Sequence, residues 1–78
     1  MFYTYVLKSE KDDELYIGFS SNLKKRLVEH TNGLVGITKD RRPFKLVYYE
    51  ACCDKEKAVE REKSLKTGFG RSYLKRRI

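Results

Sequence analysis

The sequence contains no tryptophan, no internal repeat, no low-complexity segment and no apolar run that approaches the length of a membrane span. Its first residues, MFYTYVLKSEK, lack a basic segment followed by a long apolar stretch, so we expect no signal peptide. The two cysteines, Cys52 and Cys53, are adjacent, and adjacent cysteines rarely form a disulfide. No Cys/His partner pair stands at zinc-site spacing. These absences predict a protein of the reducing cytoplasm.

A chain of 78 residues is too short for two hydrophobic cores, so we expect one domain over residues 1–78. The chain contains 6 tyrosines and 4 phenylalanines, which is rich in aromatics for this size. Lysine and arginine number 18 against 11 acidic residues, a net charge of +7. A basic surface favours polyanions, of which we favour nucleic acid over an anionic membrane surface. A strongly solvated surface would have the same composition.

Three segments have the β-branched and aromatic composition of strands: residues 2–9, 15–19 and 44–51. The first alternates, so Thr4 and Val6 lie on one face and Tyr3 and Tyr5 on the other. The short polar loop between the first two segments predicts an antiparallel hairpin.

Two segments are predicted to be helices. One runs from about residue 22 to 31, capped by Ser20 or Ser21 and ended by Asn-Gly. The other runs from its cap at Asp54 to about residue 66, where TGFG breaks it. Residues 32–43 are expected to form a loop, and residues 71–78 a short basic helix or tail. The order predicts an α+β domain, β-β-α-β-α plus a C-terminal helix, with a mostly antiparallel three-stranded sheet.

The first predicted helix places charged groups beside its apolar stripe. Leu23 and Leu27 define the stripe, and Arg26 and His30 fall along its edge at about 100° per residue. Arg26 alone would be explained by methylenes that cover the core while the guanidinium reaches water. His30 alone would be explained as a cation near a helix C-terminus.

The second predicted helix places a carboxylate inside its apolar stripe. Ala58, Glu62 and Leu65 share one face at i, i+4 and i+7, whereas Glu60 faces outward. A buried carboxylate without a partner is costly, so Glu62 should meet a cation, a hydrogen-bond donor or a metal. The plain alternative is a surface ion pair with Lys66.

The strand tyrosines add hydroxyl groups to this set. Taken alone, each of Tyr3, Tyr5 and Tyr16 would be a core residue whose hydroxyl reaches a polar partner at the rim. We expect Arg26, His30, Glu62 and these tyrosines to converge only if both helices cover the same face of the sheet. The set would then supply an acid/base group, an oxyanion stabiliser and a hard oxygen ligand, as phosphate-ester chemistry requires.

At this point the sequence resembles the GIY-YIG nuclease superfamily over nearly its whole length. Tyr16-Ile17-Gly18 is the second half of the motif, and Tyr3-Thr4-Tyr5 keeps the terminal tyrosine of the first half. FSSNLKKRLVEH follows at the spacing of the family's arginine-and-histidine helix, and AVERE resembles the signature that selects Glu62. The likeness is to short stand-alone members related to the amino-terminal nuclease domain of the bacterial excision-repair nuclease.

The resemblance implies a role for each of these residues. Glu62 would be the protein's ligand to a Mg²⁺ or Mn²⁺ ion that keeps most of its waters. Tyr5 would orient the attacking water or accept its proton, and Tyr16 would position the phosphate. Arg26 would neutralise charge on the scissile phosphate. His30 would assist as a base or hold a phosphate. The reaction would be in-line, metal-assisted hydrolysis of a phosphodiester.

Two basic runs, TKDRRP and GRSYLKRRI, are candidates for backbone contacts that bring affinity without sequence readout. The candidate nucleic-acid-binding residues are Lys39, Arg41, Arg42, Lys66, Arg71, Lys75 and Arg76. The leading hypothesis is an endonuclease acting on nucleic acid, DNA being favoured, with DNA repair as its context. The alternatives are a non-catalytic nucleic-acid-binding module of the same fold and an enzyme that is active only with a protein partner.

Overall fold

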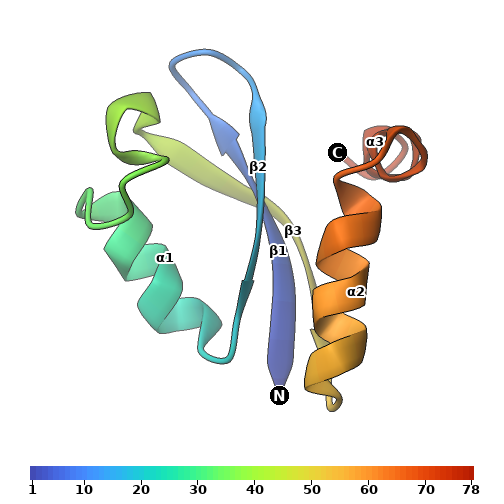
Figure 1. Cartoon of the computed structure of the whole chain (residues 1–78). Coiled ribbons are helices and arrows are strands. Elements are labelled where there is room, and N and C mark those ends of the chain that lie inside the picture. Colours follow the sequence, from blue (N-terminus) through green and yellow to red (C-terminus); the bar gives the residue numbers. More distant parts are fainter.

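The computed structural model describes the whole chain, residues 1–78 (Figure 1). One antiparallel sheet has the spatial order β2-β1-β3 and is built from β1 (Phe2–Ser9), β2 (Leu15–Ser20) and β3 (Phe44–Cys52). The helices are α1 (Leu23–Thr31), the short 3-10 helix η1 (Lys39–Arg41), α2 (Lys55–Leu65) and α3 (Gly68–Lys75). The expected α+β class, element order and antiparallel sheet are therefore confirmed.

The helices cover opposite faces of the sheet, with α1 on one side and α2 and α3 on the other (Figure 1). Thr4 donates a hydrogen bond to the Ala58 carbonyl of α2 at 2.9 Å, and Val6 packs against Leu65 and Leu74. Tyr5, between them in the strand, points to α1 instead. The condition stated for convergence of the candidate residues, that both helices cover the same face of the sheet, is therefore not met. The cause lies in β1, whose residues from Thr4 to Leu7 are all buried, so that each face of this central strand needs its own cover.

Helix α1 begins one residue later than its expected serine caps would place it. The side chain of Asn22 accepts the backbone N–H of Lys25, and Ser20 accepts the backbone N–H of Asn22. Asn22 is therefore the N-cap, and Ser20 holds the cap in place. In α2 the expected cap is confirmed, because the Asp54 carboxylate accepts the backbone N–H groups of Glu56 and Lys57.

The TGFG segment ends α2 and also begins α3. Thr67 is the N-cap of α3, and its hydroxyl accepts the backbone N–H of Gly70 at 3.3 Å. A side chain at Gly70 would clash with the backbone of Leu65, so the glycine lets the two helices approach closely. Residues 71–75 thus lie in helix α3, whose Leu74 completes the core, and residues 76–78 follow the helix. None of the helices has the length and apolar content that a membrane crossing requires.

Candidate active site

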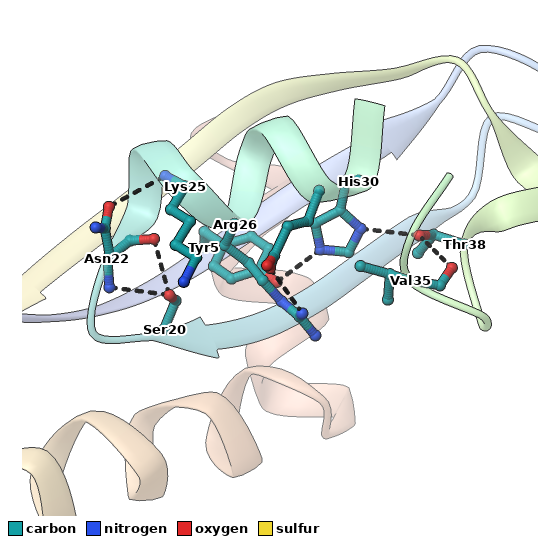
Figure 2. A network of polar contacts seen from close by, with 9 residues as sticks. Tyr5, Ser20, Asn22, Lys25, Arg26, His30, Val35 and Thr38 are labelled. Carbon is teal, nitrogen blue, oxygen red and sulfur yellow. Dashed lines mark hydrogen bonds and ion pairs between the residues drawn. The ribbon is translucent and has the colours of Figure 1, made fainter. Parts of the chain in front are cut away.

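A chain of buried hydrogen bonds joins the sheet, α1 and the loop after it (Figure 2). Oη of Tyr5 lies 2.8 Å from Nε2 of His30, and Nδ1 of His30 lies 2.8 Å from Oγ1 of Thr38. These three side chains are at most 2 % exposed. The Thr38 hydroxyl donates its one proton to the Val35 carbonyl, so it accepts from Nδ1–H of His30. Nε2 is then the free acceptor, and Tyr5 donates to it.

Gly18 makes room for the Tyr5 ring at the edge of the sheet. The two residues are register partners on β1 and β2, and β2 is an edge strand. A Cβ atom at Gly18 would lie 2.5 Å from both Cζ and Oη of Tyr5. The ring therefore crosses β2 at the one position where the edge strand has no side chain. Gly18 of the YIG sequence thus places the tyrosine hydroxyl.

Arg26 and Glu62 act on the Tyr5 hydroxyl from opposite faces of the sheet. Burial raises the pKa of Tyr5, and the adjacent Arg26 guanidinium opposes this increase. Electrostatic interactions with Tyr16 and with the Glu62 carboxylate raise the pKa of Tyr5 further. Glu62 can exert this effect because α2 packs against β2 as well as β1. The expected groups are thus not all joined by direct contacts. Arg26 and His30 lie with Tyr5 on the α1 face, whereas the only hydrogen-bond partner of the Glu62 side chain is Lys66.

Tyr16 and His30 pack around Tyr5. The Tyr16 ring lies 5.2 Å from the His30 ring, edge to face, and 6.4 Å from the Tyr5 ring. Burial lowers the pKa of His30, the charge of Arg26 lowers it further, and Glu29 opposes both. Arg26 in turn forms an ion pair with Glu29 at 3.1 Å, and its side chain is 36 % exposed. Near neutral pH the imidazole is therefore uncharged, and Arg26 is the cation that solvent and ligands can reach.

The position of Glu62 is compatible with a metal ligand and with a surface ion pair to Lys66. It lies between the buried Ala58 and Leu65 on α2, and only 20 % of its side chain is exposed. Its Oε2 also accepts from Nζ of Lys66 at 3.2 Å, the expected surface ion pair. No group of three or more His, Cys, Asp or Glu side chains forms a metal cage. A single carboxylate is a hard oxygen donor, which fits a cation such as Mg²⁺ that retains several waters.

The predicted nucleic-acid-binding residues divide into two groups. Lys66, Arg71 and Lys75 line a groove of about 1010 Å³ between α3 and the hairpin end of the sheet. Three further cations line the same groove and were missed by sequence reasoning: Lys8, Lys45 and Arg77. The register of β1 and β3, which sets Lys8 opposite Lys45, is the signal that would have found two of them. Tyr16 is the one residue that this basic groove shares with the cluster around Tyr5.

The second group lies outside the basic groove, and two of its members hold the 32–43 loop in place. Arg41 forms an ion pair with Asp12 at 3.0 Å and lies over the Phe44 ring. Arg42 donates to two backbone carbonyls, those of Lys39 and Thr31. Lys39 begins η1, and Arg76 caps the C-terminus of α3. None of these four lines the basic groove.

A three-stranded antiparallel sheet between helices, in which the glycine of a YIG sequence makes room for a tyrosine beside a histidine and an arginine, is the arrangement of a GIY-YIG-type domain. The chain matches the family model of the GIY-YIG catalytic domain over residues 1–76, and it belongs to this family. A UPF0213 protein of Staphylococcus saprophyticus is 40 % identical over 74 residues, covering 94 % of this chain and 89 % of the relative. Another UPF0213 protein, from Clostridium perfringens, is 45 % identical over 67 residues, covering 85 % of this chain and 71 % of the relative.

A solved structure shares the fold. The solution NMR structure of a UPF0213 protein from Bacillus halodurans superimposes with a TM-score of 0.59 at 29 % sequence identity. The match covers 95 % of this chain and 82 % of that protein. The likeness drawn from the YIG sequence and the helix signatures is therefore confirmed for family and fold.

Proposed function

We propose that this protein is a divalent-metal-dependent endonuclease of the cytoplasm that hydrolyses phosphodiester bonds in nucleic acid, with DNA as the favoured substrate and DNA repair as the context. Members of the GIY-YIG family are usually nucleases, and this chain is a member. The single observation that carries the proposal is the Tyr5 hydroxyl, which is hydrogen-bonded to His30 and influenced by the charges of Arg26 and Glu62.

The chain's own groups divide the work of in-line hydrolysis. Arg26, the accessible cation, binds the scissile phosphate and neutralises the charge that develops on it. Tyr16, at the mouth of the basic groove, positions that phosphate. Tyr5 orients the attacking water and takes its proton, while Nε2 of His30 accepts the proton of the Tyr5 hydroxyl. Both ring nitrogens of His30 are already hydrogen-bonded, to Tyr5 and Thr38, so His30 acts through Tyr5 as a positioning residue.

Glu62 would hold Mg²⁺ or Mn²⁺, which when bound supplies Lewis-acid stabilisation of the leaving oxygen. Lys66, the present partner of Glu62, releases the carboxylate and lines the basic groove. The groove cations contact the phosphate backbone without reading sequence. Selection of a particular nucleic acid would therefore come from its shape or from a protein partner.

A non-catalytic nucleic-acid-binding module is the second candidate function. The Glu62–Lys66 ion pair favours it, because this contact accounts for the carboxylate without a metal. The two candidates differ in what Glu62 does, since only the endonuclease requires its charge beside Tyr5.

A cleavage panel separates the two functions. Labelled branched, single-stranded and duplex substrates are incubated with Mg²⁺ or Mn²⁺ and the wild type, Glu62→Gln or Arg26→Ala. The endonuclease predicts metal-dependent cutting that Glu62→Gln abolishes and Arg26→Ala lowers about 100-fold, with salt-sensitive binding retained. Glu60→Gln, an exposed carboxylate on the same helix, is the matched control and should cut normally. Binding without cutting of any substrate by the wild type would establish the binding module instead.

A further inference from the structure

A second cavity opens on the α1 face of the sheet, beside the candidate active site. It measures about 460 Å³ and lies between the start of α1 and the strands β1 and β3. Tyr3 and Tyr49 line it from the sheet, and Leu23, Leu27 and Lys24 line it from α1. Ser21 and Asn22 complete its rim. We call this cavity the tyrosine notch.

The two tyrosines of the notch present accessible aromatic rings. Their centroids are 6.4 Å apart with the planes tilted by 54°, and Tyr49 is 54 % exposed. Tyr48, the preceding residue, makes intramolecular contacts instead: its hydroxyl donates to Glu50, and its ring packs edge to face against Tyr73. A large aromatic that is half in solvent and lines a cavity is typical of a binding surface rather than of a core.

The tyrosine notch is continuous with the candidate active site. Tyr49 is the register partner of Tyr5 across β1 and β3. Tyr3 precedes Tyr5 by two residues on β1, so its side chain is on the same face about 7 Å along the strand. Arg26, which the proposed function assigns to the scissile phosphate, directly precedes Leu27 of the notch on α1. The nucleotide next to that phosphate would therefore be within reach of the notch.

The chemistry of the notch selects a nucleobase as its occupant. Accessible tyrosine faces stack on the π-face of any base, and a lysine at the rim attracts the phosphate that accompanies it. Lys24 provides that charge, and the first turn of α1 has no acidic residue to oppose it. The net charge of +7 favours the same polyanion. A base inside a duplex already has both faces stacked, so only an unpaired base can use this surface.

We propose that the tyrosine notch stacks one unpaired nucleobase of the substrate strand next to the phosphate held by Arg26. The substrate class is then single-stranded or locally unpaired nucleic acid. This inference rests on the proposed function, whose substrate it specifies.

Tryptophan fluorescence tests the proposal without cleavage. The chain has no tryptophan, so Tyr49→Trp places a single reporter in the notch. In metal-free buffer with chelator, a single-stranded oligonucleotide should quench this fluorescence, whereas an oligonucleotide of equal length made of abasic residues should not. Quenching by both oligonucleotides would mean that the backbone alone occupies the notch and would overturn base stacking.

Affinity measurements on the same oligonucleotide give the second readout. Tyr49→Ala should weaken single-stranded binding about tenfold and leave duplex binding unchanged, and Tyr49→Phe, which keeps the ring, should bind like the wild type. Phe69→Ala is the matched control, because Phe69 is an exposed aromatic on α3, outside the notch.

The outcomes distinguish this inference from the function on which it rests. If Tyr49→Ala binds and cuts single strands like the wild type, the stacking role is wrong and the endonuclease stands. If the wild type binds no nucleic acid of either form, the proposed function fails and this inference fails with it. A notch that is quenched only by an apolar peptide would assign the surface to a protein ligand and would also overturn the proposal.

Discussion

The hydroxyl of Tyr5 and the Nε2 atom of His30 lie 2.8 Å apart, although 25 positions separate the two residues in the sequence. His30 is the one buried residue of α1, so this polar contact also fixes the helix against the sheet. The ring that positions the tyrosine hydroxyl is thus itself held by a strand, a helix and the Thr38 hydroxyl. Support from several elements keeps a site at the geometry that its chemistry requires.

Removing the Thr38 hydroxyl should disturb the tautomer of His30. In Thr38→Val the Nδ1–H group is buried without an acceptor, so we expect a loss of about 1–3 kcal/mol in unfolding free energy. Cleavage should fall while binding remains, and Thr38→Ser should restore both. Nitrogen NMR reports the tautomer directly, because the chain has a single histidine. A wild-type signal with the proton on Nε2 would contradict the assigned direction of the Tyr5 hydrogen bond.

The stability of the protein should increase with pH in the range that lies between the lowered pKa of His30 and about pH 6.5. Burial holds the pKa of His30 below the ordinary value of 6.5, so the unfolded chain binds a proton in this range that the folded chain does not. The stabilisation is complete above about pH 6.5 and is lost as the pH falls toward the lowered pKa.

Chemical denaturation across this pH range measures the effect. His30→Gln removes the only histidine, and its unfolding free energy should vary less with pH than that of the wild type. The other groups with shifted pKa values titrate elsewhere, since the pKa of Asp12 is lowered from 3.8 and that of Tyr5 is raised from 10.0. If the unfolding free energies of the wild type and His30→Gln vary equally with pH, His30 has the same pKa in the folded and unfolded states, and the prediction is wrong.

A methyl group at Gly18 should displace the Tyr5 ring. The added Cβ would meet Cζ and Oη of Tyr5 at 2.5 Å, and the fully buried ring has no free space to occupy. We expect Gly18→Ala to lose about 1–3 kcal/mol of unfolding free energy and to cut far more slowly than the wild type. Gly36→Ala is the control, since no atom lies within 4 Å of its Cβ position. If both variants are equally active, Gly18 is not needed to position the Tyr5 hydroxyl.

The sequence predicted the strands and the two longer helices closely because their patterns are local. It placed Glu62 on the buried stripe of α2 from spacing alone, and the structure agrees. The faces of the sheet were not predictable in this way, because alternation separates Thr4 from Tyr5 without saying which helix covers each side.

Contacts made by loops escaped prediction altogether. Thr38 reaches His30 only because residues 32–43 fold back over the end of α1. Arg41 resembles a ligand-binding cation in the sequence but pairs with Asp12 of the β1–β2 hairpin. Gly68 and Gly70 are typical of helix ends, yet both lie in the first turn of α3, which Thr67 caps. Gly70 is needed there because a side chain at this position would clash with the backbone of Leu65.

The basic groove and the loop arginines should differ in their effect on salt dependence. Arg71→Ala or Lys75→Ala, which remove groove cations, should each reduce the slope of log affinity against log salt by about 0.7–0.9. Arg41→Ala should leave the slope unchanged and lower stability instead, since Arg41 is already paired with Asp12. Binding titrations at several salt concentrations give the slopes. If Arg41→Ala reduces the slope as much as Arg71→Ala does, the nucleic acid contacts the 32–43 loop.

Lys66 should compete with a divalent cation for Glu62. Its ammonium lies 3.2 Å from Oε2 of the carboxylate, the atom that a hard cation would bind, and 54 % of the Lys66 side chain is exposed. Removing the ammonium removes the competitor, so Lys66→Ala should bind Mn²⁺ about twofold more tightly than the wild type, because an exposed i, i+4 pair contributes only about 0.3–0.5 kcal/mol. Electron paramagnetic resonance of Mn²⁺ measures this without any substrate. Lys63→Ala, an exposed lysine on the same helix, is the control for the change in net charge. Tighter Mn²⁺ binding that persists in the Lys66→Ala, Glu62→Gln double variant would mean that the ion binds elsewhere, since the second change removes the only carboxylate that faces Lys66 at this distance.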